Sequence, residues 1–418
     1  MTIYTPFKEK IEPLQNDHEF RVIISFETLS KRDEFIKNYR DLKILSKFDL
    51  IPSINVNLEK ETIVQYENKK IIKQIEEDQK LYLSMLDVLE ILDLDEYKNS
   101  HITYEGNKVN IGIIDDGINT KFPSISSVKD SSDRYKKRTV NNVSENMITH
   151  GTIMASIIKN HFRNDEDNLI GIAPKANIID LKLTSSTGEY YFSDVLHIFD
   201  KINEDQIEMD ILLISLSSQE PSDGKDVLSK ACNLYSKEGS IIVCPAGNSG
   251  PDSQTIGSPG AAERVITVGA LTKDFLIPNF SGRGPTLDNR IKPDVCLPGS
   301  DITVPLSNNV QVKVTGTSVA ASIGAGIIAL IKELDPQISY DAVLELIKKS
   351  RFDLNLDPNS QGLGTIKISD LFKKLDLFHE ELIPYNYLMM RSLKLAIEFF
   401  SLFLIVFYLF YFFRLIRI

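Results

Sequence analysis

The chain has little cysteine and no excess of positive charge. Its 418 residues include three cysteines, Cys232, Cys244 and Cys296, which are too widely spaced for a CxxC metal site. The fold is therefore predicted not to depend on disulfides, and we expect three reduced, mostly buried thiols, compatible with a reducing compartment. The net charge of −11 argues against nucleic acid as a partner.

The N-terminus lacks the apolar segment of a secretory signal peptide, whereas the C-terminus contains a long apolar run. Residues 395–413 read LAIEFFSLFLIVFYLFYFF, with Glu398 as their one charge. Such a run is long enough to cross a hydrocarbon core of roughly 30 Å. A buried amphipathic helix is the alternative, but no polar face continues beyond Glu398. We expect a single-pass C-terminal anchor in the lipid membrane, with the bulk of the chain in the cytoplasm.

Residues 19–82 show the pattern of a small α+β domain, preceded by a lead at residues 1–18. Apolar, β-rich segments alternate with segments of helical periodicity. The segments are Phe20–Glu27, Lys31–Leu42, Ser53–Leu58, Glu59–Lys69 and Lys70–Asp78. Their order fits the β-α-β-β-α-β arrangement of a ferredoxin-like unit.

Residues 83–378 follow a different pattern, in which short, almost wholly apolar strands alternate with helical segments such as Phe192–Glu204 and Lys225–Gly239. This pattern is typical of a doubly wound parallel sheet with helices on both faces. The strands are predicted at Val109–Asp115, Ala176–Leu183, Met209–Ser217, Gly239–Gly247 and Arg264–Leu271. A connector at residues 379–394 leads to the predicted membrane helix, and residues 414–418 form a short basic tail.

Four polar residues stand at the ends of predicted elements, where sites form in open α/β sheets. Asp115 ends one strand and Asn248 follows another, while His150 and Ser318 each open an apolar helix. Taken singly, each has a simpler explanation as a turn or helix-capping residue. Together they supply the acid, imidazole, carboxamide and hydroxyl that nucleophilic acyl transfer requires.

The stretch KVTGTSVAASIGAG, Lys313–Gly326, places Ser318 before a run of alanine and glycine. Small residues let a helix pack closely against its neighbours, which is one explanation of the run. A nucleophilic serine at the first turn of a buried helix is the other. The stretch alone does not separate the two.

The order Asp, His, Asn, Ser and the motifs around these residues resemble the subtilisin-like serine peptidases (the subtilase, or peptidase S8, family). The motifs are DDG at Asp115, HGT at His150, AGN at Asn248 and GTSVA at Ser318. Further segments in family order include GIAPKANIIDLKL, GSPGAAERVITVGAL and NFSGRGP. They extend the resemblance over residues 106–334.

The resemblance implies a serine endopeptidase that acts on peptides or proteins and requires no cofactor. Ser318 would be the nucleophile, His150 the base, and Asp115 rather than Asp116 the acid that orients His150. Asn248 would join the Ser318 N–H in the oxyanion hole. The walls implied for the substrate cleft are Ser215, Leu216, Ser217, Ala246 and Gly247.

The chain departs from the family pattern close to the predicted site. Ser217 stands where the family usually has glycine, and Ser322 stands where proline is common, four residues after the nucleophile. Ile153 replaces a frequent histidine after HGT. None of these changes removes a catalytic group, so they concern the shape of the substrate subsites.

The acidic loop Asn164–Asn168 lies where many relatives bind calcium. Asp165 and Asp167 are therefore candidate calcium ligands, although a solvated loop fits the sequence better. No other metal site is expected.

Residues 49–78 resemble the inhibitory propeptide of these peptidases, of the inhibitor-I9 type. The resemblance implies a zymogen whose own propeptide occupies the cleft. Self-cleavage is then expected within Gln79–Asp87.

Two further functional questions follow from this prediction. A membrane-tethered pseudo-peptidase that only binds peptides is a competing function, but all four predicted catalytic groups are retained. For an active enzyme on the cytoplasmic face, trimming of a leader peptide before export and general protein degradation both fit the sequence. A membrane helix that directs the enzyme outward is the alternative topology.

Overall fold

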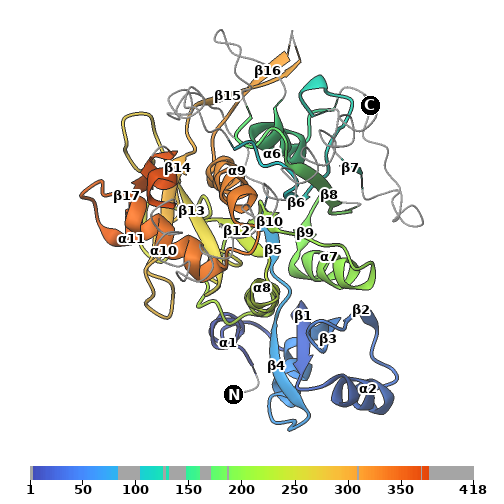
Figure 1. Cartoon of the computed structure of the whole chain (residues 1–418). Coiled ribbons are helices and arrows are strands. Elements are labelled where there is room, and N and C mark those ends of the chain that lie inside the picture. The colour runs from blue at the N-terminus through green and yellow to red at the C-terminus, as the bar shows by residue number, and fades with distance from the viewer. Residues whose placement is uncertain are drawn as a thin grey trace, which may run out of the picture. The chain divides into compact units, whose positions relative to one another are not determined.

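The computed structural model describes residues 3–82, 104–125, 129–130, 147–160, 171–185, 188–307, 310–368 and 370–375. Two sheets organise these residues, an N-terminal sheet of four strands and a central sheet of seven. Figure 1 shows both, with the N-terminal unit in blue and the central sheet between helices α7, α8 and α9. Both sheets belong to the compact unit Met1–Ile368.

The N-terminal sheet has the predicted β-α-β-β-α-β order, although none of the five predicted segments covers its second strand. Its elements are β1 (Glu19–Phe26), α2 (Leu29–Asn38), β2 (Ile44–Phe48), β3 (Ser53–Glu59), α3 (Lys60–Tyr66) and β4 (Ile72–Glu77). The strands lie in the order β2-β3-β1-β4, and each neighbouring pair is antiparallel. The region predicted as an N-terminal lead, for which no element was assigned, contains a short helix, α1 (Thr5–Ile11).

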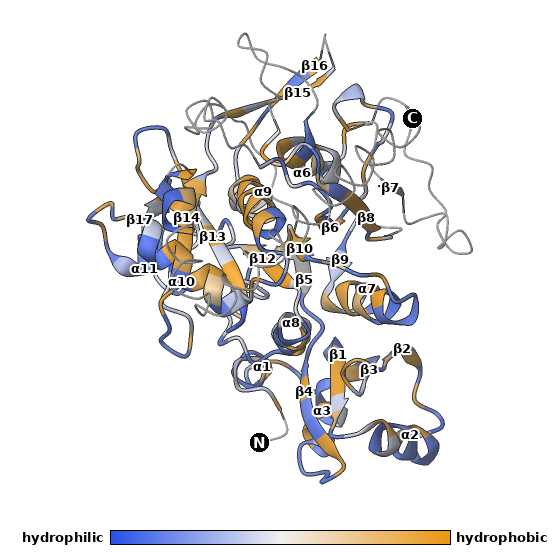
Figure 2. Cartoon of the chain, viewed as in Figure 1, coloured by the Kyte–Doolittle hydropathy of each residue, from blue (hydrophilic) through white to orange (hydrophobic). Residues whose placement is uncertain are grey.

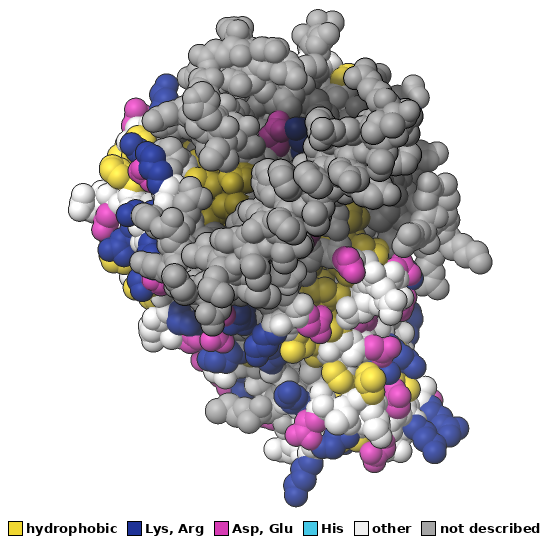
Figure 3. All heavy atoms as spheres, in the orientation of Figure 1, with side chains coloured by type: hydrophobic (Ala, Val, Ile, Leu, Met, Phe, Trp, Pro, Cys, Tyr) yellow, Lys and Arg dark blue, Asp and Glu magenta, His cyan; other side chains and the backbone are white. Residues whose placement is uncertain are grey.

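Alternating apolar residues give the N-terminal unit its own core. Val22, Ile24 and Phe26 of β1 are buried together with Phe35 of α2 and Ile63 of α3. Ile23, the residue between Val22 and Ile24, faces the other side of the strand and is buried in the core shared with α7 and α8, so β1 is covered on both faces. Figure 3 shows Lys, Arg, Asp and Glu side chains mixed over the surface of the N-terminal unit.

The central sheet is parallel throughout and has the strand order β14-β13-β12-β10-β6-β8-β7. Its strands are β6 (Asn110–Asp115), β7 (Lys129–Asp130), β8 (Asn177–Lys182), β10 (Ile211–Ile214), β12 (Ile241–Pro245), β13 (Val265–Leu271) and β14 (Val295–Pro298). All five predicted strands are present, and β7 and β14 were not predicted. The predicted doubly wound parallel sheet is thus confirmed.

Helices cover both faces of this sheet, which explains why its strands are almost continuously apolar. On one face lie α6 (His150–Lys159) and α9 (Thr317–Leu334); on the other lie α7 (Phe192–Glu204) and α8 (Val227–Lys237). Along β12, Val243 is directed toward α9, whereas Ile242 and Cys244 share a core with α8. Figure 2 shows β12, β13 and α9 as largely hydrophobic.

The remaining elements are short or peripheral. They are η1 (Pro123–Ile125), β5 (Lys80–Tyr82), β9 (Tyr190–Tyr191), β11 (Ser217–Ser218), β15 (Ile302–Ser307), β16 (Val310–Val314), α10 (Tyr340–Ser350), β17 (Arg351–Phe352), α11 (Pro358–Gln361) and β18 (Thr365–Ile366). β5, β9 and β11 form a three-stranded sheet of their own, which becomes important at the site.

The cysteines and the apolar helices bear on two further predictions. Cys232, Cys244 and Cys296 are buried free thiols, as expected. Within the described residues, one helix is long and apolar enough to cross a membrane, but this helix is α9, which is mostly buried in the core. The predicted membrane segment, residues 395–413, lies outside the described residues, as do the connector and the basic tail.

Candidate active site

The four predicted residues lie at the ends of elements around the centre of the parallel sheet. Asp115 is the last residue of β6, and Asn248 lies three residues beyond the end of β12. His150 is the first residue of α6, and Ser318 is the second of α9. Because β6 and β12 both pair with β10, their carboxyl ends lie at one edge of the sheet.

His150 connects Asp115 to Ser318. Its Nδ1 lies 2.8 Å from Oδ2 and 3.0 Å from Oδ1 of Asp115. Its Nε2 lies 3.1 Å from the Ser318 Oγ. With a carboxylate at Nδ1, the ring carries its proton there and directs the lone pair of Nε2 at the serine. All three side chains are buried, and the imidazole is placed to accept the hydroxyl proton.

Asp115 is held in its ionised form. Burial acts to raise the pKa of this carboxyl, but the charge and hydrogen bond of His150 outweigh burial and leave the pKa below its ordinary value. Two further donors contribute. The Ser215 hydroxyl and the Asp116 N–H (2.7 Å) both donate to the carboxylate. The anion is therefore available to stabilise an imidazolium at His150.

Asp116 has a different contact from its neighbour. Its carboxylate accepts from the backbone N–H of His150 (3.1 Å) and of Gly151 (2.8 Å), so it caps the start of α6. Burial and the charge of Asp115 raise the pKa of Asp116 to about 7. Asp115 therefore contacts the imidazole, and Asp116 positions the helix that carries it.

Asn248 is oriented by the residue that precedes Ser318. Its Oδ1 accepts from the Thr317 N–H (3.0 Å) and from the Thr317 hydroxyl (2.8 Å). Since the oxygen of the carboxamide is fixed in this way, its NH₂ group is left to donate elsewhere. Ser318 lies in the first turn of α9, where backbone N–H groups have no acceptor within the helix.

The alanine and glycine run in α9 allows close packing. A Cβ atom on Gly326 would lie 2.7 Å from the side chain of Ile172, and one on Gly324 would lie 3.2 Å from Val268. Ser322, which stands where proline is common, donates its hydroxyl to the Ser318 carbonyl (2.9 Å). The run therefore lets α9 pack against the central sheet while it carries Ser318 at its start.

The predicted cleft walls come from two neighbouring segments. Ser215 directs its hydroxyl at Asp115, and Leu216 is buried in the core shared with α7 and α8. Ser217 begins β11. In the second segment, Ala246 is buried, and Gly247 has a φ of +92°, which favours glycine. The motif that marked Ser215 as a candidate cleft residue gave no indication of its contact with the acid.

A strand of the same chain pairs with the segment that begins at Ser217. β5 pairs antiparallel with β11 on one side, in the register Ser217↔Tyr82, and with β9 on the other side, in the register Leu81↔Tyr190. An extended peptide thus completes a three-stranded sheet beside the triad. This is the strand-addition geometry by which many proteins bind peptides.

Two carboxyl groups at the end of β4, those of Glu76 and Asp78, accept hydrogen bonds at the N-termini of helices α8 and α7. Asp78 accepts from the Ser193 N–H (2.9 Å) at the start of α7. Glu76 accepts from the Val227 N–H (2.7 Å) at the start of α8. The N–H groups in the first turn of a helix have no acceptor within the helix, and these two carboxyl groups supply one. The N-terminal unit thus docks on both helices that cover this face of the sheet.

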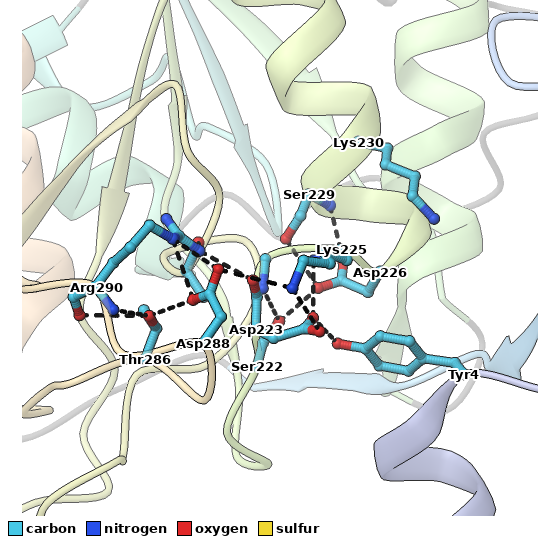
Figure 4. A network of polar contacts seen from close by, with 12 residues as sticks. Tyr4, Ser222, Asp223, Lys225, Asp226, Ser229, Lys230, Thr286, Asp288 and Arg290 are labelled. Atoms are coloured by element: carbon cyan, nitrogen blue, oxygen red, sulfur yellow. Dashed lines mark hydrogen bonds and ion pairs between the residues drawn. The ribbon is translucent and has the colours of Figure 1, made fainter.

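Tyr4, the residue that precedes helix α1, adds a further contact. Tyr4 donates its hydroxyl to Asp223, which lies in the loop before α8. Figure 4 shows how this tyrosine reaches a network that includes Asp226 and Arg290. The Arg290 side chain donates to the Asp223 carbonyl (2.9 Å). The contact between the N-terminal unit and the rest of the chain therefore extends beyond β4 and β5.

Metal ligands were predicted in a part of the chain that the structure does not describe. Asp165 and Asp167 lie in residues 161–170, outside the described residues. Among the residues that are described, no group of three or more His, Cys, Asp or Glu side chains could hold a metal ion.

The fold and the contacts of Asp115, His150 and Ser318 define a class of protein, the serine-type endopeptidases. A model of the subtilase family matches residues 106–364, and the chain belongs to this family. The resemblance predicted from the motifs is thereby confirmed.

Several relatives match most of this chain. Serine protease AprX of Bacillus subtilis (strain 168) is 28% identical over 396 residues, which are 84% of this chain and 88% of that protein. Subtilisin DY of Bacillus licheniformis is 27% identical over 267 residues, 63% of this chain and 91% of its own length. The major intracellular serine protease of Bacillus subtilis (strain 168) is 28% identical over 296 residues, 66% and 86% of the two chains.

A solved structure supports the fold. The prenylagaramide maturation protease PagA superposes with a TM-score of 0.53, over 68% of this chain and 99% of that one. Its sequence identity is 19%, so the likeness concerns the fold alone.

Proposed function

We propose that this chain is a self-processing serine endopeptidase with Asp115, His150 and Ser318 as its catalytic triad. The supporting observation is the continuous path of hydrogen bonds from the Asp115 carboxylate through His150 to the Ser318 hydroxyl, with distances of 2.8 and 3.1 Å. Asn248 completes the site as an oxyanion donor. No cofactor is needed for this chemistry.

In the first half-reaction, the Ser318 Oγ attacks the carbonyl carbon of the scissile bond. Its proton passes to Nε2 of His150, and Asp115 stabilises the imidazolium. The carboxamide NH₂ of Asn248 and the Ser318 N–H donate to the oxygen as it becomes negative. His150 then gives its proton to the leaving amine, the C–N bond breaks, and an acyl-enzyme forms.

In the second half-reaction, water replaces the amine. His150 takes a proton from the water as its oxygen attacks the acyl carbon, and the same donors stabilise the second oxyanion. The ester bond to Ser318 breaks, and the serine recovers its proton. The products are a carboxylic acid and an amine, as peptide hydrolysis requires.

The N-terminal unit acts as an inhibitory propeptide in this proposal. Support comes from β5, which fills the position of a substrate strand between β9 and β11. Because antiparallel strands advance in opposite directions, a substrate that continued the register Ser217↔Tyr82 by two residues would set residue 84 opposite Ser215. We therefore propose Ser84–Met85 as the maturation bond. It falls within the predicted range, Gln79–Asp87, and outside the described residues.

Three parts of the proposal rest mainly on sequence. The apolar run at residues 395–413 supports a membrane anchor. A cytoplasmic site of action is supported by similarity to a protease that is named intracellular.

Calcium binding by Asp165 and Asp167 is tested by measuring the melting temperature with and without a chelator. The chelator should lower the melting temperature of the wild type and leave that of the variant with asparagine at both positions unchanged.

The test compares the full chain in detergent with its Ser318→Ala variant. Intact mass should reveal loss of residues 1–84 from the wild type alone, and a fluorophosphonate should label the wild type alone. A folded wild-type protein that shows neither processing nor labelling would contradict the proposal. Processing without dependence on Ser318 would assign the cleavage to another enzyme.

A further inference from the structure

Helices α6 and α9 pack against each other and carry His150 and Ser318 in their first turns. The two residues are in contact there, with 3.1 Å between Nε2 and Oγ. One turn further along both helices, the Ser322 hydroxyl donates to the Sδ of Met154 over 3.0 Å. The helices are thus joined by two polar contacts, one through the predicted base and nucleophile and one behind them.

The spacing of these contacts is the same on both helices. Met154 follows His150 by four residues, and Ser322 follows Ser318 by four. Residues four apart lie one above the other on the same face of a helix, so the second pair lies next to the first. Because the contacts advance in the same direction along both helices, a shift of either helix along its axis would disturb both pairs together.

The Ser322 hydroxyl also reaches the backbone of the predicted nucleophile. Its oxygen lies 2.9 Å from the Ser318 carbonyl oxygen, so its single hydrogen has two acceptors within reach, this carbonyl and the Met154 sulfur. A serine that donates to the carbonyl four residues earlier often bends its helix slightly. Ser322 therefore acts on the turn of α9 that contains Ser318 and, through the sulfur, on α6.

Both contacts lie in the interior of the protein. Met154 and Ser318 are each 1% exposed, His150 is 2% exposed, and Ser322 is fully buried. A buried hydroxyl without a partner is unfavourable, so the two acceptors define where the Ser322 oxygen can lie. Close-packed interiors transmit a small shift of one side chain to its neighbours. A displacement at the second contact would therefore reach the first.

We propose that Ser322 is a positioning residue, which together with Met154 sets the distance between His150 and Ser318. This inference rests on the proposed peptidase function and adds a determinant of its rate. Transfer of the Ser318 proton to Nε2 requires the two atoms to be well placed, and a misplacement of about 1 Å can lower a rate about 10²-fold. Ser322 acts through the backbone of Ser318 and exchanges no proton in the reaction.

The experiment uses the full chain in detergent and three variants, Ser322→Ala, Met154→Leu and the two combined. The first removes the hydroxyl, and the second removes the sulfur at nearly constant volume. Each single variant should react with a fluorophosphonate about tenfold more slowly than the wild type. In kcat for a peptide with the sequence of residues 78–91 the same factor is expected, with KM changed by less than about twofold, because an interaction between catalytic groups is lost and not one with bound substrate.

The double variant tests whether the two residues act through one contact. It should react no more slowly than either single variant, whereas independent effects would multiply to about a hundredfold. The matched control is Ser156→Ala, which removes a buried hydroxyl of α6 that contacts Ser124 (3.2 Å). Its labelling rate should equal that of the wild type.

Melting temperatures are measured in parallel, because a purely structural role would lower them without changing the labelling rate. Wild-type labelling rates in the folded single variants would overturn the inference, and so would effects that multiply in the double variant. Labelling that depends on Ser318 would in both cases leave the proposed function intact. If one single variant does not fold, the labelling rate of the other decides. If the wild type is not labelled at Ser318, the proposed function fails and this inference fails with it.

Discussion

Glu76 should make the docking of the N-terminal unit depend on pH. This carboxyl is 1% exposed and accepts from the Val227 N–H at the start of α8. Burial raises the pKa of Glu76 to about 8, although the charge of Lys230 acts in the opposite direction. The nearby carboxylates of Asp226 and Asp223 add to the rise. The docked unit therefore holds a proton that a solvated glutamate would release.

Whether docking weakens or strengthens with pH depends on which form of the N-terminal unit, docked or undocked, holds the proton. Below the ordinary pKa of 4.5 the carboxyl is protonated in both states, and the contribution of the group to docking is fully present. As the pH rises from 4.5 toward about 8, the undocked unit is ionised but the docked unit is not, so docking weakens. Because docking takes up at most one proton through this group, the dissociation constant should rise by at most about tenfold per pH unit.

The assay uses two separate chains, residues 1–84 and the remainder with Ser318→Ala, so that neither is degraded. Calorimetry from pH 5 to 9 gives the dissociation constant, and Glu76→Gln should flatten its pH dependence by up to one proton. The control is Glu77→Gln on the same strand, where the carboxylate pairs with Lys10 inside the N-terminal unit. An unchanged slope in Glu76→Gln would refute the reasoning.

Three substitutions test the site and its scaffold. Asn248→Ala should lower kcat about 10²–10³-fold with little change in KM, the range known for the corresponding carboxamide in subtilisin; an unchanged kcat would remove Asn248 from the oxyanion hole. Ser215→Ala deletes one donor to the ionised Asp115 and should lower kcat/KM about tenfold, which corresponds to roughly 1.4 kcal/mol of barrier; wild-type kinetics would show the contact to be dispensable. Gly326→Ala should cost about 1–3 kcal/mol in urea unfolding, because its methyl would lie 2.7 Å from Ile172, and unaltered stability would mean that the helix shifts freely.

The sequence predicted the residues of the site better than it predicted the residues that hold them in position. Asp115, His150 and Ser318 stand in short motifs whose order is informative, and each occupies the end of a regular element. Asp116 and Ser215 also act on the site, through α6 and through the acid. Their contacts join segments far apart in the chain, and no local pattern distinguishes such a serine or aspartate from a turn residue.

In the N-terminal unit, too, local structure was easier to predict than contacts between distant segments. Its strand and helix order was predictable from alternation and helical periodicity, which are local properties of the chain. The region before it was predicted only as a lead, with no element assigned; α1 forms there, and Tyr4 contacts Asp223. A helix of seven residues has little intrinsic stability, so its existence depends on what it packs against rather than on its own sequence.

The departures from the family pattern illustrate why residue identity alone does not reveal a role. Proline at position 322 would have no N–H, and the carbonyl of Ser318 would lose the partner that an uninterrupted helix supplies. Ser322 keeps this N–H and adds its own hydroxyl to the same carbonyl. Ser217, in contrast, makes no contact with the triad and instead occupies space beside Gly247 and Gly257. One serine adds a second donor to a carbonyl of the helix that carries the nucleophile, while the other packs against two glycines, and only their surroundings separate the two positions.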